Sequence, residues 1–123
     1  MLDLYEYVIN KIKNETGIVP YTDYVPTDKI YPYIQFQFPN NIPNGYGELV
    51  PMQIDIWDKS HSKAKVEKMA DSIDRIFNRL NETTVDFSLQ IYRNNPYRLN
   101  IPDPDMEIRH RELRYMVKIY RKE

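Results

Sequence analysis

The chain has 123 residues, of which 41% are hydrophobic and 28% charged, and its formal net charge at pH 7 is −1. That length and balance predict a single domain spanning residues 1–123 and exclude wholesale disorder or a coiled-coil rod. The near-neutral charge offers no field that would gather nucleic acid, and no run approaches the roughly eighteen apolar residues that a membrane span needs. Carboxylates near the start argue against a signal peptide, and the absence of cysteine fits a reducing compartment.

The first predicted element is a helix from about Asp3 to Gly17. Asp3 and Glu6 have the spacing of a capping box, and apolar residues follow at helical intervals up to Ile12. Gly17 can close the helix in a left-handed cap. The prolines of residues 18–32 then exclude another helix and predict a short extended segment and a loop.

Two strictly alternating runs, residues 33–38 and 52–57, predict neighbouring antiparallel strands. A loop of about residues 39–49 joins them. Asn44-Gly45 is a turn signal within this loop, but the connection is longer than a tight hairpin, so a mobile tip is expected.

The next predicted element is an amphipathic helix with a continuous apolar stripe. Asp58 or Ser60 could cap its start, and Asn81 could end it. Charged side chains occupy the opposite face, so the helix is expected to lie on a sheet. The stripe consists of Val66, Met69, Ala70, Ile73, Ile76, Phe77 and Leu80.

Two further alternating runs, residues 85–92 and 113–120, predict amphipathic strands. A second long loop, at about residues 94–108, is expected between them, and a loop of that length in a small domain is usually functional or disordered. Together the elements predict an α+β fold, in which an antiparallel sheet of about four to six strands carries an N-terminal helix and a central amphipathic helix. The polar face of the sheet is left without a covering element.

Nothing in the pattern predicts an enzyme, a metal site or a cofactor. His61 and His110 are far apart in the chain, and neither has a carboxylate at the helical spacing of a metal site or a triad. Asp103 and Asp105 alternate with Pro104 but lack the glycine and the terminal glutamate of a calcium loop. The glycines form no phosphate-binding loop. Assembly with other proteins is therefore the expected role.

Charge is concentrated around the last predicted strand. Basic residues crowd the chain from Arg109 to Lys122, and Asp103, Asp105 and Glu107 precede them. The basic strand could follow a phosphate backbone, or it could keep an edge strand from pairing promiscuously. An acidic loop beside a basic strand also suits a ring, in which the negative surface of one subunit meets the positive surface of the next.

Several short motifs follow one another in a particular order along most of the chain. They are Tyr21, Val25-Pro26, Pro32-Tyr33-Ile34, the strand from Met52 to Trp57, Ser60-His61-Ser62, the amphipathic helix through Leu80, and the strand from Leu113 to Tyr120. In this order they resemble the small tail-completion or tail-terminator proteins of long-tailed bacteriophages, which form the ring that finishes the tail tube and joins it to the head. Related head-closure and head-tail adaptor proteins share much of this pattern.

The resemblance implies a structural virion protein that forms a ring of identical subunits, expected to be a hexamer. Its implied partners are the tail-tube protein and a head-tail connector or stopper protein, with no membrane and with nucleic acid only as DNA that passes through the lumen. Its implied location is the host cytoplasm during assembly and then the tail or neck of the virion. The two long loops would become ordered on contact. The residues expected at a subunit or partner interface are Asn44, Tyr46, Tyr97, Arg98, Asp103, Asp105, Arg109, Arg111, Arg114 and Lys118.

Charge also bears on which surface would line such a lumen. Strong positive charge on its wall would hold phosphates, so the basic last strand is expected to face a neighbouring subunit.

Three other functions stay open on the sequence. The chain could bind nucleic acid, with bases stacked on Tyr92, Tyr97, Tyr115 and Tyr120 beside the basic strand. It could be a small enzyme that uses the polar face of the sheet, although this would need convergent titratable groups. It could also be a toxin–antitoxin or other bacterial regulatory partner.

Overall fold

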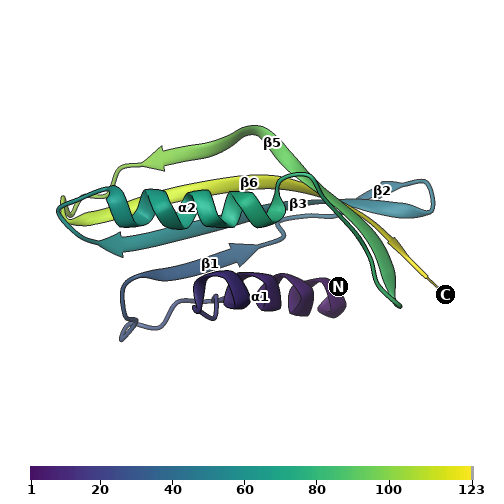
Figure 1. The fold of residues 1–123 in the computed structure, drawn as a ribbon, viewed down its shortest axis with the longest axis horizontal. Helices are drawn as coiled ribbons and strands as arrows, with labels where there is room; N and C mark the ends of the chain where they lie inside the picture. Colours follow the sequence, from purple (N-terminus) through teal and green to yellow (C-terminus); the bar gives the residue numbers. More distant parts are fainter. Residues whose placement is uncertain (123) are drawn as a thin grey trace.

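The computed structural model describes residues 1–122, which form two helices and six strands (Figure 1). In chain order these elements are α1 (Leu2–Thr16), β1 (Tyr33–Gln37), β2 (Ile42–Asn44), β3 (Gly47–Lys59), α2 (Ala64–Phe77), β4 (Leu80–Thr83), β5 (Phe87–Ile101) and β6 (Ile108–Arg121).

All six strands belong to one antiparallel sheet, whose order is β1-β3-β6-β5-β4, while β2 pairs with β3 beyond the end of β1. The long central strands β3 and β6 pair from Glu48 opposite Ile119 to Lys59 opposite Ile108. Both helices pack on one face of this sheet, side by side (Figure 1). The predicted α+β class, with two helices on an antiparallel sheet, is confirmed.

The core lies between the helices and the sheet. The α2 stripe supplies Val66, Ala70, Ile73 and Phe77, each with no exposed surface. The sheet contributes alternate side chains of its strands, as the period-2 pattern predicts. These are Ile34 and Phe36 from β1, Val50, Met52, Ile54 and Ile56 from β3, Phe87, Leu89 and Ile91 from β5, and Leu113, Tyr115, Val117 and Ile119 from β6.

Helix α1 ends where the sequence predicts and begins differently. Gly17 has φ 76°, and its N–H donates to the carbonyl of Lys13, so the left-handed cap is confirmed. The capping box is wrong, because the N-cap is Met1 and no side chain caps the helix. The Asp3 carboxylate instead accepts hydrogen bonds from Arg121, at the far end of the chain.

Helix α2 is shorter than predicted at both ends. Asp58 belongs to β3, and the helix follows Lys63 without a side-chain cap. The Ser60 hydroxyl accepts a hydrogen bond from the N–H of Ser62 and so shapes the preceding turn. The helix ends at Phe77 with Asn78 as its C-cap, because the chain turns there and residues 80–83 pair with β5 as β4.

The expected loop at 39–49 is largely a hairpin. Strands β2 and β3 pair from Ile42 opposite Leu49 to Asn44 opposite Gly47, which leaves a two-residue turn. Gly45 has φ 61°, the conformation that a tight hairpin needs at this position. A Cβ on Gly47 would lie 2.5 Å from the carbonyl oxygen of Ile119, so glycine lets the hairpin approach β6 closely.

The expected loop at 94–108 is also mostly strand. Strand β5 continues to Ile101, and only residues 102–107 form a turn before β6. The register with β6 shifts between Arg93 and Arg98, so a bulge absorbs the intervening residues. Pro96 is tolerated there because β4 pairs only with residues 88–91 of β5, which leaves the outer edge beyond them unpaired.

Candidate subunit interface

One face of the sheet carries no helix, and we call it the helix-free face. Because side chains alternate along each strand, this face presents the residues between the core positions. On β1, β3 and β6 they are Tyr33, Gln35, Gln37, Pro51, Gln53, Asp55, Trp57, His110, Glu112, Arg114, Met116, Lys118 and Tyr120. The sequence predicts a polar face without a covering element; no helix lies on this face, but Tyr33, Asp55 and Glu112 on it are buried.

An aromatic stack crosses the helix-free face at one end. Tyr33 lies opposite Trp57 in the register, and Trp57 lies opposite His110. Their ring centroids are 4.8 Å and 4.1 Å apart, with interplanar angles of 16° and 21°. Burial raises the pKa of Tyr33 to about 12, and the nearby Tyr31 and acidic groups add to that effect. The Nε2 atom of His110 lies 2.7 Å from Asp55 Oδ1.

A polar network continues from the stack along the same face. The Gln53 amide donates to Asp55 at 3.1 Å and to Glu112 at 2.7 Å. Arg114 also donates to Glu112, at 2.8 Å. Asp55 is only 5% exposed and Glu112 only 6%, yet both carboxylates have hydrogen-bond partners. The face is therefore an ordered surface with its buried charges satisfied.

On the helix side of the sheet, arginines of β5 and β6 bind acids of α2. Arg98 contacts Glu67 at 2.9 Å and Asp71 at 2.7 Å. Arg111 binds Glu67 and Asn100 and is only 4% exposed. These guanidinium groups fasten α2 to the sheet, and their charge is neutralised inside the chain.

A second junction joins the last turn of α2 to the sheet. The buried Tyr115 hydroxyl donates to Asp74 at 2.8 Å, and Arg93 binds the same carboxylate. Burial opposes ionisation of Asp74, but these hydrogen bonds outweigh it, so the pKa of Asp74 lies below its ordinary value. Burial and the bond to Asp74 raise the pKa of Tyr115. The guanidinium carbon of Arg93 also lies 4.0 Å from the centroid of the Tyr97 ring.

The predicted interface residues fall in separate places. Asn44 and Tyr46 lie at the tip of the β2–β3 hairpin, and Tyr46 is fully exposed. Tyr97 lies in the bulge of β5, whereas Arg98 and Arg111 are taken up by the ion pairs with α2. Buried in those pairs, Arg111 offers no surface to a partner.

The remaining predicted residues lie on β6 and in the turn before it. Asp103 and Asp105 sit in the turn of residues 102–107, which we call the β5–β6 turn. Arg109 donates to the backbone carbonyls of residues 60 and 61, which ties β6 to the start of α2. Arg114 and Lys118 lie on the helix-free face, where Arg114 pairs with Glu112. Arg111, Arg114 and Arg121 of the basic strand are therefore paired with acids of the chain, whereas Arg109 and Lys118 have no ion pair within residues 1–122.

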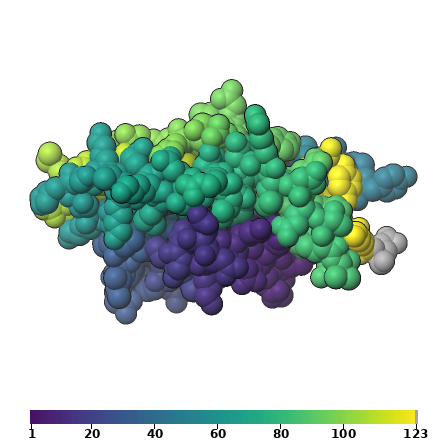
Figure 2. Space-filling model, in the orientation of Figure 1, coloured from purple at the N-terminus to yellow at the C-terminus, as the bar shows by residue number. Residues whose placement is uncertain are grey.

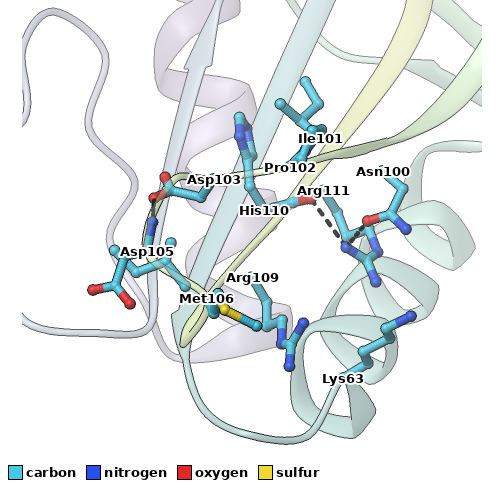
Figure 3. A pocket seen from close by; sticks show the side chains of 11 residues that line it. Lys63, Asn100, Ile101, Pro102, Asp103, Asp105, Met106, Arg109, His110 and Arg111 are labelled. Carbon is cyan, nitrogen blue, oxygen red and sulfur yellow. Dashed lines mark hydrogen bonds between the residues drawn. The ribbon is translucent and has the colours of Figure 1, made fainter.

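An open pocket of about 470 Å³ lies beside the β5–β6 turn (Figure 3). The carboxylates of Asp103 and Asp105 lie on one side of it, and the cationic groups of Lys63, Arg109 and Arg111 lie on the other (Figure 3). Arg109 and Arg111 are already bound to protein oxygens. The titratable groups thus do not converge on one point, as an active site would require.

Two further observations bear on the functions that the sequence leaves open. Among residues 1–122, no three histidine, cysteine or acidic side chains gather as metal ligands, and no helix is long and apolar enough to cross a membrane. Tyr115 is fully buried, so it cannot stack on a base together with Tyr92, Tyr97 and Tyr120 as the nucleic-acid hypothesis expects.

Sequence reasoning missed the cross-strand cluster of Trp57, His110 and Asp55 and the acids of α2. Trp57 and His110 are far apart in the chain, and only the β3–β6 register makes them neighbours. The acids Glu67, Asp71 and Asp74 do have the helical spacing of one face, which could have signalled a shared partner.

No protein-family model matches the chain, and no curated protein sequence matches it. Among solved structures, the fold is similar to that of a chain in the virion of the native gene transfer agent particle, with a TM-score of 0.70 and 10% sequence identity. The match covers 94% of this chain and 92% of that chain. At this identity the likeness shows a common fold.

Proposed function

We propose that this chain is a structural protein of a long-tailed phage or phage-like particle, and that it forms the ring that ends the tail tube and joins it to the head connector. The observation that carries the proposal is the fold that it has in common with a chain of the gene transfer agent virion, over almost the full length of both chains. The order of sequence motifs points independently to the same class of protein.

The shape of the subunit suits assembly with neighbours on two sides. The molecule is elongated, with the β2–β3 hairpin at one end and the β5–β6 turn at the other (Figure 1). Large apolar side chains stand out at its turns: Tyr46 is 103% exposed, Val85 91% and Met106 85%. Such side chains gain most from burial against a partner.

The internal ion pairs are compatible with DNA passing through a ring. Arg98 and Arg111 are neutralised by the acids of α2, and Arg114 is neutralised by Glu112. A wall built from such surfaces would hold phosphates weakly, since affinity for DNA rises with each free cation that meets a phosphate.

The proposal is tested by adding the purified chain to purified tail tubes that lack an end cap. We expect rings of uniform mass by mass photometry, hexamers above all, and added density at one end of each tube by negative-stain electron microscopy. A chain that stays monomeric at all concentrations and leaves tube ends bare would contradict the proposal.

A matched pair of variants assigns the hairpin tip within that assay. Tyr46→Ser should weaken ring formation or tube capping, because it removes the most exposed aromatic side chain of the hairpin. Tyr24→Ser is the control, since Tyr24 is also an exposed aromatic residue, at 77%, but lies outside the hairpin. Equal effects of the two variants would exclude the hairpin tip as a contact.

A further inference from the structure

The strongest unexplained surface is an apolar groove between the ends of the two helices, with a volume of about 510 Å³. Residues 18–32 border the first turns of α2 there, at the left of Figure 2. We call it the α1–α2 groove. Its apolar lining is Ile18, Ile30, Tyr31, Pro32 and Met69, and its polar lining is Glu15, Thr16, Lys65, Lys68 and Ser72.

The rim of the α1–α2 groove is positively charged. Lys65 and Lys68 lie one helical turn apart and are both exposed. Neither ammonium group has an ion-pair partner within residues 1–122, whereas Arg93, Arg98, Arg111, Arg114 and Arg121 of β5 and β6 do. The side chains of Lys65 and Lys68 are therefore unpaired charges on α2, whereas Arg109 of β6, which also has no acidic partner, is bound to backbone carbonyls.

The β5–β6 turn has the complementary chemistry. Met106 is 85% exposed at its tip, and Asp103, Asp105 and Glu107 flank it. Asp103 and Asp105 have no ion-pair partner within the described chain, and Glu107 has only the exposed His61 at 3.6 Å. A flexible apolar side chain between carboxylates matches an apolar groove with a lysine rim.

The β5–β6 turn is also preformed. Asp103 Oδ1 accepts a hydrogen bond from the N–H of Asp105, and Asp105 Oδ1 accepts one from the N–H of Glu107, both at 2.9 Å. The N–H of Ser60 donates to the carbonyl of Glu107 at 2.8 Å. These bonds fix the turn at the end of the sheet, so little ordering entropy is lost when it docks, and it is not free to fold onto the groove of its own chain.

We propose that the β5–β6 turn of one copy docks in the α1–α2 groove of the next copy, with Met106 in the groove and Asp103 and Asp105 beside Lys65 and Lys68. The two surfaces differ, so the contact is heterologous and closes into a ring when the rotation between subunits allows it. This inference rests on the proposed ring and names its central contact. The rest of the interface excludes water around it.

Charge removal tests the inference. Asp103→Asn with Asp105→Asn keeps the acceptor oxygens of the turn and removes two charges, while Lys65→Gln with Lys68→Gln removes the opposite pair. Each double variant should raise the protein concentration needed for assembly about tenfold, the effect of losing two exposed ion pairs per contact. Wild-type assembly should weaken with added salt, and assembly of the variants should depend on salt much less.

Matched controls change the net charge equally at exposed residues outside the contact. They are Glu6→Gln with Asp86→Asn for the acids and Lys13→Gln with Lys122→Gln for the lysines. These controls should assemble as the wild type does.

Disulfide trapping gives a second readout, because the chain contains no cysteine. A Met106→Cys chain mixed with a size-tagged Met69→Cys chain should form a mixed disulfide on mild oxidation. Val85→Cys mixed with Met69→Cys is the control, since Val85 is equally exposed, at 91%, in a different turn. The mixed disulfide should exceed that of the control at least about tenfold, because docking raises the effective concentration of the two thiols.

The outcomes separate the two proposals. Rings that form normally in both double variants, with no excess of the 106–69 disulfide, would overturn the docking inference and leave the proposed function standing. A wild-type chain that forms no ring and caps no tube would overturn the proposed function and this contact with it. Loss of assembly in both double variants but not in the controls, together with the excess disulfide, is the result that we expect.

Discussion

The hydrogen bond between Tyr115 and Asp74 gives the most direct test of how α2 is held on the sheet. Tyr115 is fully buried, and its hydroxyl donates to Asp74 Oδ1 at 2.8 Å. Arg93 still binds the same carboxylate when this bond is lost. A bond to a charged group contributes about 1.5–3 kcal/mol, and the lower end applies because phenylalanine keeps the packing of the ring. Tyr115→Phe should therefore lower the free energy of unfolding by about 1.5 kcal/mol and Tm by about 5 °C.

Urea unfolding followed by the fluorescence of Trp57, the single tryptophan, measures this change. The control is Tyr92→Phe, because Tyr92 is 43% exposed and its hydroxyl makes no hydrogen bond within residues 1–122. The denaturant slope should stay constant, so that the midpoint alone shifts.

The pKa of Asp74, followed by carboxyl NMR, provides the second readout. It lies below its ordinary value of 3.8 in the wild type, and it should rise in Tyr115→Phe because one of its donors is gone. A carboxyl pKa that is lower in the folded than in the unfolded state stabilises the fold at pH values above the unfolded-state pKa. The difference in unfolding free energy between wild type and Tyr115→Phe should therefore narrow as the pH falls below about 4. Equal stability of Tyr115→Phe and Tyr92→Phe, with an unchanged pKa of Asp74, would refute the reasoning.

Two further predictions concern the hairpin and the chain termini. Gly47→Ala should destabilise the β2–β3 hairpin by about 2 kcal/mol, because its Cβ would lie 2.5 Å from the carbonyl oxygen of Ile119. Gly45→Ala has open space around its Cβ and should cost only about 1 kcal/mol of backbone strain. Amide exchange of residues 42–49 measures both changes, and equal protection of the two variants would contradict the clash at Gly47. Asp3→Asn should lower stability by about 1 kcal/mol at neutral pH, since the hydrogen bond from Arg121 lowers the pKa of Asp3 from 3.8 to about 2, and exposure of the pair to solvent reduces the full effect. Because the pKa of Asp3 is lowered in the folded state, the difference in unfolding free energy between wild type and Asp3→Asn should be constant above about pH 5 and vanish towards pH 2. Urea titrations at several pH values measure this difference, and a difference that does not narrow at low pH would exclude the Asp3–Arg121 pair as its cause.

The spacing of apolar residues predicted most of the fold. In β1, β3 and β6, and in the stripe of α2, the apolar residues fall at the positions that are buried in the structure. Val66, Ala70, Ile73 and Phe77 are all buried as the stripe predicts. What periodicity could not predict is the extent of the strands. Strand β5 runs through Pro96 to Ile101 because a bulge and an unpaired outer edge accommodate the proline, and both depend on tertiary pairing.

The candidate interface was predictable only in part, for a different physical reason. The number of arginines and acids near the last strand is visible in the sequence, but their partners are not. Arg98 and Arg111 reach α2 because β5 and β6 are neighbours, and Glu67 then serves both. Basic residues that the sequence places near the last strand thus form ion pairs that hold α2 on the sheet. Asp103 and Asp105 in the β5–β6 turn, by contrast, have no ion pair within residues 1–122, and the sequence already shows this cluster of acids.

The different uses of arginine and lysine in this chain follow from their chemistry. A guanidinium group is planar and weakly hydrated and can bind two acceptors at once, so Arg98 and Arg111 suit partly buried sites against α2. An ammonium group is strongly hydrated, and Lys65 and Lys68 stay at the surface, where a partner can reach them. Salt screens exposed charges far more than buried pairs. Added salt should therefore weaken the proposed contact between copies while the fold of the chain persists, and assembly and unfolding can be measured separately on the same protein.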